Sequence, residues 1–125
     1  VLPNSLITLG NYAFYKCNAL TGVNLPDGLL TIGERAFYQC TGLTNIMLPE
    51  GVTEIASSLF SWCSNLTSVT IGNSVTSIGE DAFYGCSGLT SVTIPNSVTT
   101  IEEGDSVVVV TRTTGLQDLQ DVLDN

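Results

Sequence analysis

The chain contains no histidine and very few basic residues, and these absences exclude several classes of function. Lys16, Arg35 and Arg112 stand against twelve acidic residues, which gives a net charge of −9 at pH 7. Nucleic acids and anionic membrane surfaces are both bound through Lys and Arg, so neither is expected as a partner. Without histidine, a cysteine–histidine nucleophile is impossible.

Long apolar runs are missing as well. No run approaches the roughly 20 residues that a membrane-spanning helix needs, so membrane insertion is not expected, and no signal peptide is visible. Charged residues make up only 12% of the 125 residues, against a usual share of about 25%. Ser, Thr, Asn and Gly take their place. This neutral polar composition favours a secreted or cell-surface protein with a single core.

What the chain does have is a repeat with a step of 23 residues. The step relates four cysteines, four phenylalanines and five further apolar positions, without a gap from Val1 to Ile101. A unit of this length cannot bury its apolar side alone, but stacked units can, so the repeat predicts a solenoid over 1–101. The two rows that we expect to line its core are Phe14, Phe37, Phe60 and Phe83, and Cys17, Cys40, Cys63 and Cys86.

Each unit predicts a short strand, an extended return and a tight turn. "LTSVTI" at 89–94 alternates apolar and polar residues and is rich in β-branched side chains, which is typical of a strand. "NSVTSIG" at 73–79 predicts a short extended return. "EDAFYGC" at 80–86 would bury Ala, Phe and Cys on one face of a single helical or 3₁₀ turn. We therefore expect one parallel sheet, with short return strands and the Phe–Cys turns opposite.

The repeated phrase I-G-x-x-A-F-x-x-C-x-x-L, together with an L-x-x-L-x-L strand followed by Pro, resembles the leucine-rich repeat of the BspA-like, or Treponema pallidum, class. The third unit departs from the phrase with "IASSLFSWC" at 55–63 but keeps its phase. The resemblance implies a leucine-rich repeat solenoid without cofactors, at an extracellular or cell-surface location. It also implies attachment to host proteins or to other cells.

The repeat fails after Ile101. Ser106 stands where the next Phe is due, and no further Cys follows. The pattern predicts a strand at Val107–Thr111 and a short amphipathic helix at Leu116–Leu123. The segment 102–125 is either a C-terminal cap, which the exposed end of a solenoid requires, or the start of a next segment.

The cysteines and aromatic residues have simple expected roles. Equivalent side chains of stacked strands point the same way, about 4.8 Å apart, whereas a disulfide requires Cβ atoms about 3.8 Å apart. The cysteines are therefore expected to be reduced and buried, and a straight row of them does not form a zinc site. Tyr15, Tyr38 and Tyr84 are expected to point outward. Together with Tyr12 and Trp62, they either lie flat over the turns or act as interface anchors.

The outward positions of the predicted strands are the remaining candidate site. They form polar ladders on the sheet face, which solenoids use as an extended binding surface. The face lacks the Tyr, Trp and Arg anchors of typical interfaces, so it could equally be only solvated. The candidate residues are Thr21, Asn24, Thr44, Asn45, Met47, Thr67, Ser68, Thr70, Thr90, Ser91 and Thr93.

Two functions stay open, and neither is enzymatic. The first is a protein-interaction or adhesion module of a cell-surface or secreted leucine-rich repeat protein, with a host or cell-surface protein as its ligand. The second is a structural solenoid, natural or of designed consensus, that acts as a spacer or assembles end to end. Val1 and Leu2 begin inside a unit, so the N-terminal end is expected to lack a cover and to allow such assembly.

Overall fold

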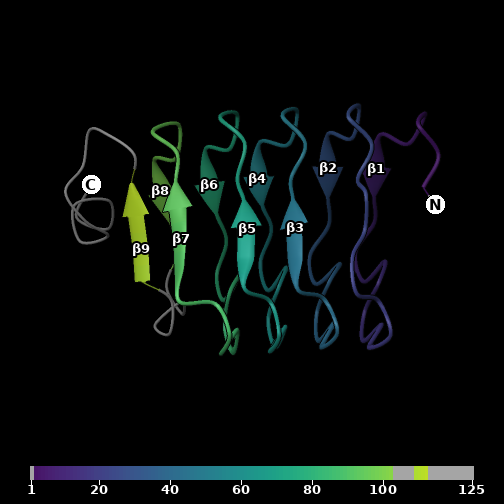
Figure 1. The fold of residues 1–125 in the computed structure, drawn as a ribbon. Helices are drawn as coiled ribbons and strands as arrows, with labels where there is room; N and C mark the ends of the chain where they lie inside the picture. The colour runs from purple at the N-terminus through teal and green to yellow at the C-terminus, as the bar shows by residue number, and fades with distance from the viewer. Residues whose placement is uncertain (1, 103–108, 113–125) are drawn as a thin grey trace.

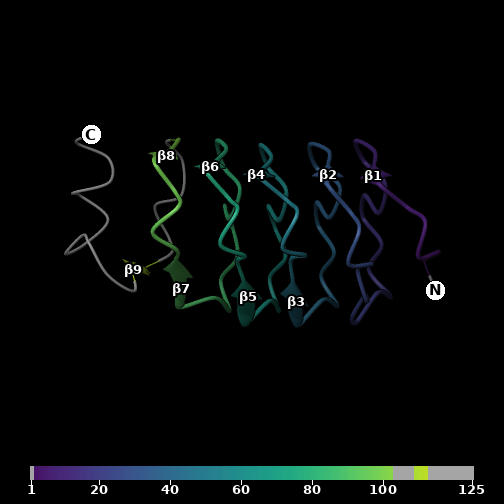
Figure 2. The ribbon, with the colours of Figure 1, turned by 90° about the horizontal axis from the view of Figure 1, so that it is seen from above.

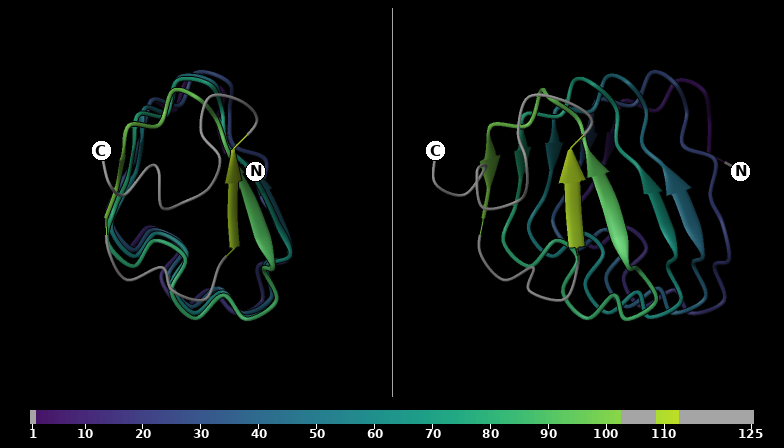
Figure 3. Two further views of the ribbon diagram at one scale, coloured as in Figure 1. Left: turned by 90° about the vertical axis from the view of Figure 1, so that its left-hand side faces the viewer. Right: turned by 60° about the vertical axis from the view of Figure 1, so that its left-hand side comes forward.

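The computed structural model describes residues 2–102 and 109–112, which wind into a solenoid of stacked coils (Figures 1 and 3). Each 23-residue unit forms one coil, and the coils follow one another along a single direction when seen from above (Figure 2). The predicted repeat solenoid with short parallel strands is therefore confirmed.

One side of the solenoid carries the main strands, β3 (Asn45–Met47), β5 (Ser68–Thr70) and β7 (Ser91–Ile94). β3 and β5 pair in parallel, with Ile46 opposite Val69, one repeat apart. Ile46 and Val69 point into the core, whereas the residues on either side of each are exposed. This alternation follows from the two-residue period of a strand and matches the apolar–polar pattern of the sequence.

The opposite side carries the return strands, each of which is two residues long. They form two parallel sheets, one of the first two strands and one of the last three, in which partners are 23 residues apart: Thr8 lies opposite Thr31 and Ser77 opposite Thr100. In the first three, the leading side chain is exposed and the second is buried. The return strands are β1 (Thr8–Leu9), β2 (Thr31–Ile32), β4 (Glu54–Ile55), β6 (Ser77–Ile78) and β8 (Thr100–Ile101).

The Ala-Phe-Cys segment does not form the predicted helical or 3₁₀ turn, and that prediction was wrong. In the second coil, alternate N–H groups bond three residues back, as from Tyr38 to Arg35, while Phe37 and Gln39 donate to carbonyl groups of the next coil. Arg35 and Gln39 also take positive φ angles of 56° and 55°. A helix cannot satisfy both conditions, so the segment is a series of tight turns paired with its neighbour, and the described residues contain no helix.

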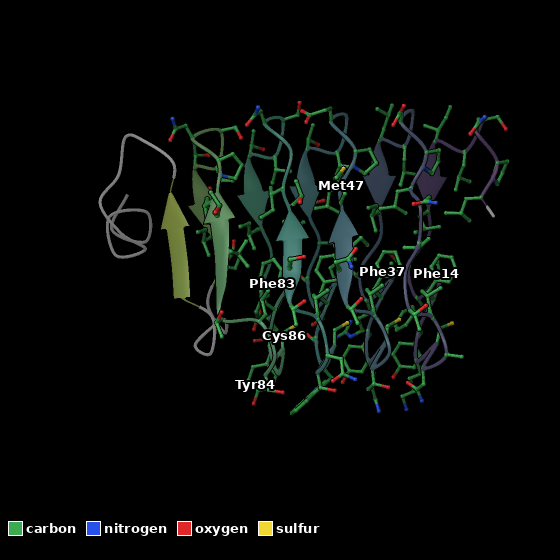
Figure 4. The ribbon with its side chains drawn as sticks, in the orientation of Figure 1. Phe14, Phe37, Met47, Phe83, Tyr84 and Cys86 are labelled. Carbon is green, nitrogen blue, oxygen red and sulfur yellow. The ribbon has the colours of Figure 1, made fainter. Side chains whose placement is uncertain are left out.

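A stack of phenylalanine rings runs through the core (Figure 4). The ring centroids of Phe14 and Phe37 are 5.4 Å apart, those of Phe37 and Phe60 5.8 Å, and those of Phe60 and Phe83 5.7 Å. Phe37, Phe60 and Phe83 are buried, whereas Phe14, in the first coil, is partly exposed.

The cysteine row runs alongside the phenylalanine stack, and all four thiols are free. Cys40, Cys63 and Cys86 are fully buried, and Cys17 is partly buried. The thiols of Cys40 and Cys63 donate hydrogen bonds of 3.1 and 3.0 Å to the carbonyl oxygens of Phe14 and Phe37 in the preceding coil. The cysteines are thus more than apolar spacers, because each bond joins two neighbouring coils.

Beyond the last full repeat, β7 pairs with a further strand in a two-stranded sheet that is separate from the sheet of β3 and β5. β9 (Val109–Arg112) pairs in parallel with β7, with Ser91 opposite Val109, so the step is 18 residues instead of 23. β9 overlaps the strand predicted at Val107–Thr111. The helix predicted at Leu116–Leu123 lies outside the described residues, and the role of 102–125 as a cap or a next segment stays a prediction.

Candidate functional site

The strand face, meaning the eleven outward residues predicted above as candidates, is mostly exposed as expected. Ten of them are exposed, from Thr21 in the first coil to Thr93 in β7. Ser91 lies in β7 and pairs with Val109 of β9. The face therefore exists as one surface, but its residues differ in what they leave available to a partner.

The threonine row of this face joins successive coils. The backbone N–H and the side-chain hydroxyl of Thr67 both donate to the carbonyl oxygen of Thr44, at 2.8 and 3.0 Å. Thr44 makes the same pair of bonds to Thr21, at 3.3 and 3.5 Å. Because these hydroxyl protons are already used, these threonines offer a partner only acceptor atoms.

Met47 is the most prominent apolar group on the strand face (Figure 4). Its side chain is 69% exposed, at the end of β3. A shallow groove of about 240 Å³ beside it is bordered by Asn24, Thr70 and the acidic residues Asp27 and Glu50. Met is an adaptable contact residue because its side chain is flexible and polarizable. Met47 is therefore an exposed apolar group at a position where the other coils carry Asn24, Thr70 and Thr93.

A second candidate surface follows the turns, and we call it the aromatic edge: Tyr12, Tyr15, Tyr38, Trp62 and Tyr84. Tyr15 and Tyr38 stack with their centroids 5.1 Å apart, while Tyr12 meets Tyr15, and Trp62 meets Tyr84, edge-on at 5.2 Å. Tyr84 points away from the core at the turn (Figure 4). The rings thus form two groups, Tyr12–Tyr15–Tyr38 and Trp62–Tyr84, and all of them are exposed except Tyr38, which is partly buried.

Two of the chain's three cations lie against this edge. The Nζ atom of Lys16 is 5.3 Å from the ring centroid of Tyr15, and the guanidinium carbon of Arg35 is 6.0 Å from that of Tyr12. Both distances are within the range of a cation–π interaction. The first two coils therefore place Lys16 and Arg35 beside aromatic rings, and Arg35 also forms an ion pair of 3.9 Å with Glu34.

Within the described residues, no group of three or more His, Cys, Asp and Glu side chains is placed to hold a metal ion. Burial raises the pKa of the Cys40 thiol to about 11 and that of Cys63 to about 12, so neither is a thiolate nucleophile at neutral pH. The same part of the chain contains no helix able to cross a membrane.

Residues 1–104 match the family model of the BspA type leucine rich repeat region. A comparison with curated protein sequences gave no match. Among solved structures, a leucine rich cell surface protein from Faecalibacterium prausnitzii is 30% identical with a TM-score of 0.89, over 99% of this chain and 34% of that one. A leucine rich repeat protein of T. pallidum is 33% identical with a TM-score of 0.81, over 87% and 56%.

The pneumococcal vaccine antigen PcpA is 25% identical with a TM-score of 0.75, over 90% of this chain and 30% of that one. The chain thus spans about a third to a little over half of the length of these three structures. The repeated phrase, the stacked coils and the match over residues 1–104 show that the chain belongs to the family of BspA-type leucine-rich repeat proteins.

Proposed function

We propose that this chain is a non-enzymatic protein-binding module of a bacterial surface protein, and that the strand face contacts the ligand. Two observations on relatives support a surface location: one similar structure is described as a cell surface protein, and another as a vaccine antigen. The ligand would then be a protein outside the cell, such as a host protein or a protein of another cell.

The observation that carries this proposal is the exposure of Met47 in the middle of a polar face. An apolar side chain of a partner would pack on Met47, and basic side chains next to it would meet Asp27 and Glu50 at the border of the groove. Charges at the edge of an interface mainly steer association, whereas a central apolar contact supplies most of the affinity. A partner segment with an apolar residue between basic residues has this complementary chemistry.

The test is binding of extracellular matrix and cell-surface proteins to the immobilised chain, compared with two variants. Met47→Glu places a charge at the centre of the face and should weaken binding at least about tenfold. Thr31→Glu places the same charge on an exposed position of the return strands, so binding should stay within about twofold. Equal affinity of the Met47→Glu variant and the parent would contradict the strand face as the site.

End-to-end association is the second candidate. At the N-terminal end, Leu2, Phe14, Leu20 and Val23 line a cavity of about 500 Å³, and the last three are only partly buried. These apolar side chains support stacking on another coil. A preceding repeat in a longer protein would fill the same place, so the test is sedimentation of the chain over a concentration range, with and without additional N-terminal repeats. Growth in size that those repeats do not suppress would contradict association through this end.

A further inference from the structure

The tyrosine row of the aromatic edge has a gap in the third coil. Positions 15, 38 and 84 carry Tyr, but position 61 carries Ser. Ser61 is only 2% exposed, and its hydroxyl donates a 2.5 Å hydrogen bond to the carbonyl oxygen of Asp81. Tyr38 stacks on Tyr15 on one side, and on its other side no aromatic ring of the described residues stacks on it. Within the described residues, Tyr38 therefore has one stacked aromatic neighbour, and the position that would supply a second carries a serine.

Trp62 follows Ser61 in the sequence, and its indole lies against the following coil. A Cβ atom at position 85 would lie 2.5 Å from Cε3 of Trp62, so the indole occupies the space above Gly85 in the following coil. Gly85 also has a φ of 76°, which glycine adopts without strain. The indole also meets Tyr84 edge-on and stays 45% exposed, and it borders a surface groove together with Tyr38 of the preceding coil.

A shallow groove of about 350 Å³ lies between the two aromatic side chains, and we call it the Tyr38–Trp62 groove. It is lined by Tyr38, Gln39, Thr41, Trp62 and Ser64, none of which is charged. This volume is at the lower end of the range for small-molecule sites, about 300–1,000 Å³.

The polar groups of the groove are available to a ligand. Within the described part of the chain, no hydrogen bond engages the side-chain amide of Gln39, the hydroxyl of Ser64 or the indole N–H of Trp62. The Thr41 hydroxyl donates to Asn18 at 3.3 Å and keeps its acceptor capacity. The groove thus combines aromatic surface with unused donors and acceptors.

We propose that the Tyr38–Trp62 groove binds one neutral sugar ring of a glycan. A pyranose has an apolar face of C–H groups, which stacks on aromatic rings, and a rim of hydroxyl groups that both donate and accept hydrogen bonds. The side chains of Gln39 and Ser64 can both donate and accept hydrogen bonds, and the indole N–H of Trp62 can donate one. Binding an uncharged ligand in an uncharged groove requires no charge to be desolvated. The site is separate from the strand face and does not depend on the function proposed for it.

An aromatic side chain of a protein partner is the competing occupant. It would stack in the same place but would leave the amide, hydroxyl and indole groups of the groove without new partners. An acidic sugar is disfavoured, because the groove has no cation and the chain carries a net charge of −9. The observations therefore favour a neutral sugar.

Trp62 is the only tryptophan of the chain, so its fluorescence reports on the groove directly. We would titrate the protein with three neutral trisaccharides, namely maltotriose, cellotriose and N,N′,N″-triacetylchitotriose, and with N-acetylphenylalanine amide as the aromatic side-chain probe. At least one trisaccharide should cause a saturable change in Trp62 emission. Tyr38→Ala, which removes one wall, should weaken that binding about tenfold.

Two further variants separate the groove from general effects. Tyr12→Ala removes an exposed ring of the same edge outside the groove, so affinity should stay within about twofold. Gly85→Ala should push the indole back into the groove and reduce binding, with thermal unfolding followed by circular dichroism to verify that the variant folds. The proposal is overturned if no trisaccharide alters the emission, if only N-acetylphenylalanine amide does so, or if Tyr12→Ala weakens sugar binding as much as Tyr38→Ala.

Discussion

Replacing Phe60 with Ala should destabilise the solenoid far more than the same change at Phe14. Phe60 is fully buried, and its ring stacks on Phe37 at 5.8 Å and on Phe83 at 5.7 Å. Truncating a core Phe to Ala costs about 3–5 kcal/mol, and the loss of two stacked pairs places Phe60 at the upper end of this range. Phe14 is partly exposed and stacks only on Phe37 among the described residues, so we expect about 1–2 kcal/mol there.

Urea unfolding followed by circular dichroism measures this difference, with the free energy of unfolding obtained by linear extrapolation. Because a loss of this size is a large part of the usual stability of about 5–15 kcal/mol, Phe60→Leu provides a milder variant that keeps the coil filled. Tyr84→Ala is the control, since that ring is exposed at the turn and should cost under about 1 kcal/mol. Equal losses at Phe60 and Phe14 would refute the view that the stack stabilises neighbouring coils cooperatively.

Two further predictions concern the close contact between coils. Gly33→Ala would place a Cβ atom 2.5 Å from the backbone nitrogen of Asn11 and should lower the free energy of unfolding by about 1–3 kcal/mol. Gly10→Ala, at the same repeat position, meets nothing within 4 Å and should change it by no more than about 0.5 kcal/mol. Similar losses of stability in urea unfolding of the two variants would contradict the contact. The raised pKa values of Cys40 and Cys63 favour the neutral thiols in the fold, so stability should fall as pH rises from about 9 toward 11 and 12, by up to about 1.4 kcal/mol per unit for each thiol. Thiolate labelling of both residues at about pH 8 should be slow in the folded chain and fast in urea; rapid labelling of the folded chain would contradict their burial.

The sequence predicted the solenoid because the 23-residue step places the same side chain at the same point of every coil. The row of phenylalanines that includes Phe37 could therefore be assigned to the core from the sequence alone. The turn was mispredicted because its hydrogen bonds run to the next coil. Arg35 and Gln39 adopt positive φ angles there, which such residues rarely do. Local propensity carries no information about a bond made 23 residues away.

The candidate site was predicted only in part for a similar reason. The strand face could be placed from the alternation of each strand, but the hydroxyl of Thr67 is used by the preceding coil, and nothing in the threonine itself indicates this. The Tyr38–Trp62 groove was missed, although its signal is present in the sequence. Ser61 replaces the repeated Tyr in the one unit that departs from the phrase, and Trp62 follows it.

A solenoid of near-identical coils offers every partner the same chemistry at every step, so specific recognition has to come from positions where the repeat is broken. Met47 and Trp62 are two exposed breaks of this kind. Met47 interrupts a row whose other members are Asn24, Thr70 and Thr93, and Trp62 stands beside the gap in the tyrosine row. The positions that keep the repeat fill the core or join the coils. The two breaks lie on different sides of the coil, so a protein ligand on the strand face and a glycan at the aromatic edge could bind together without contact between them.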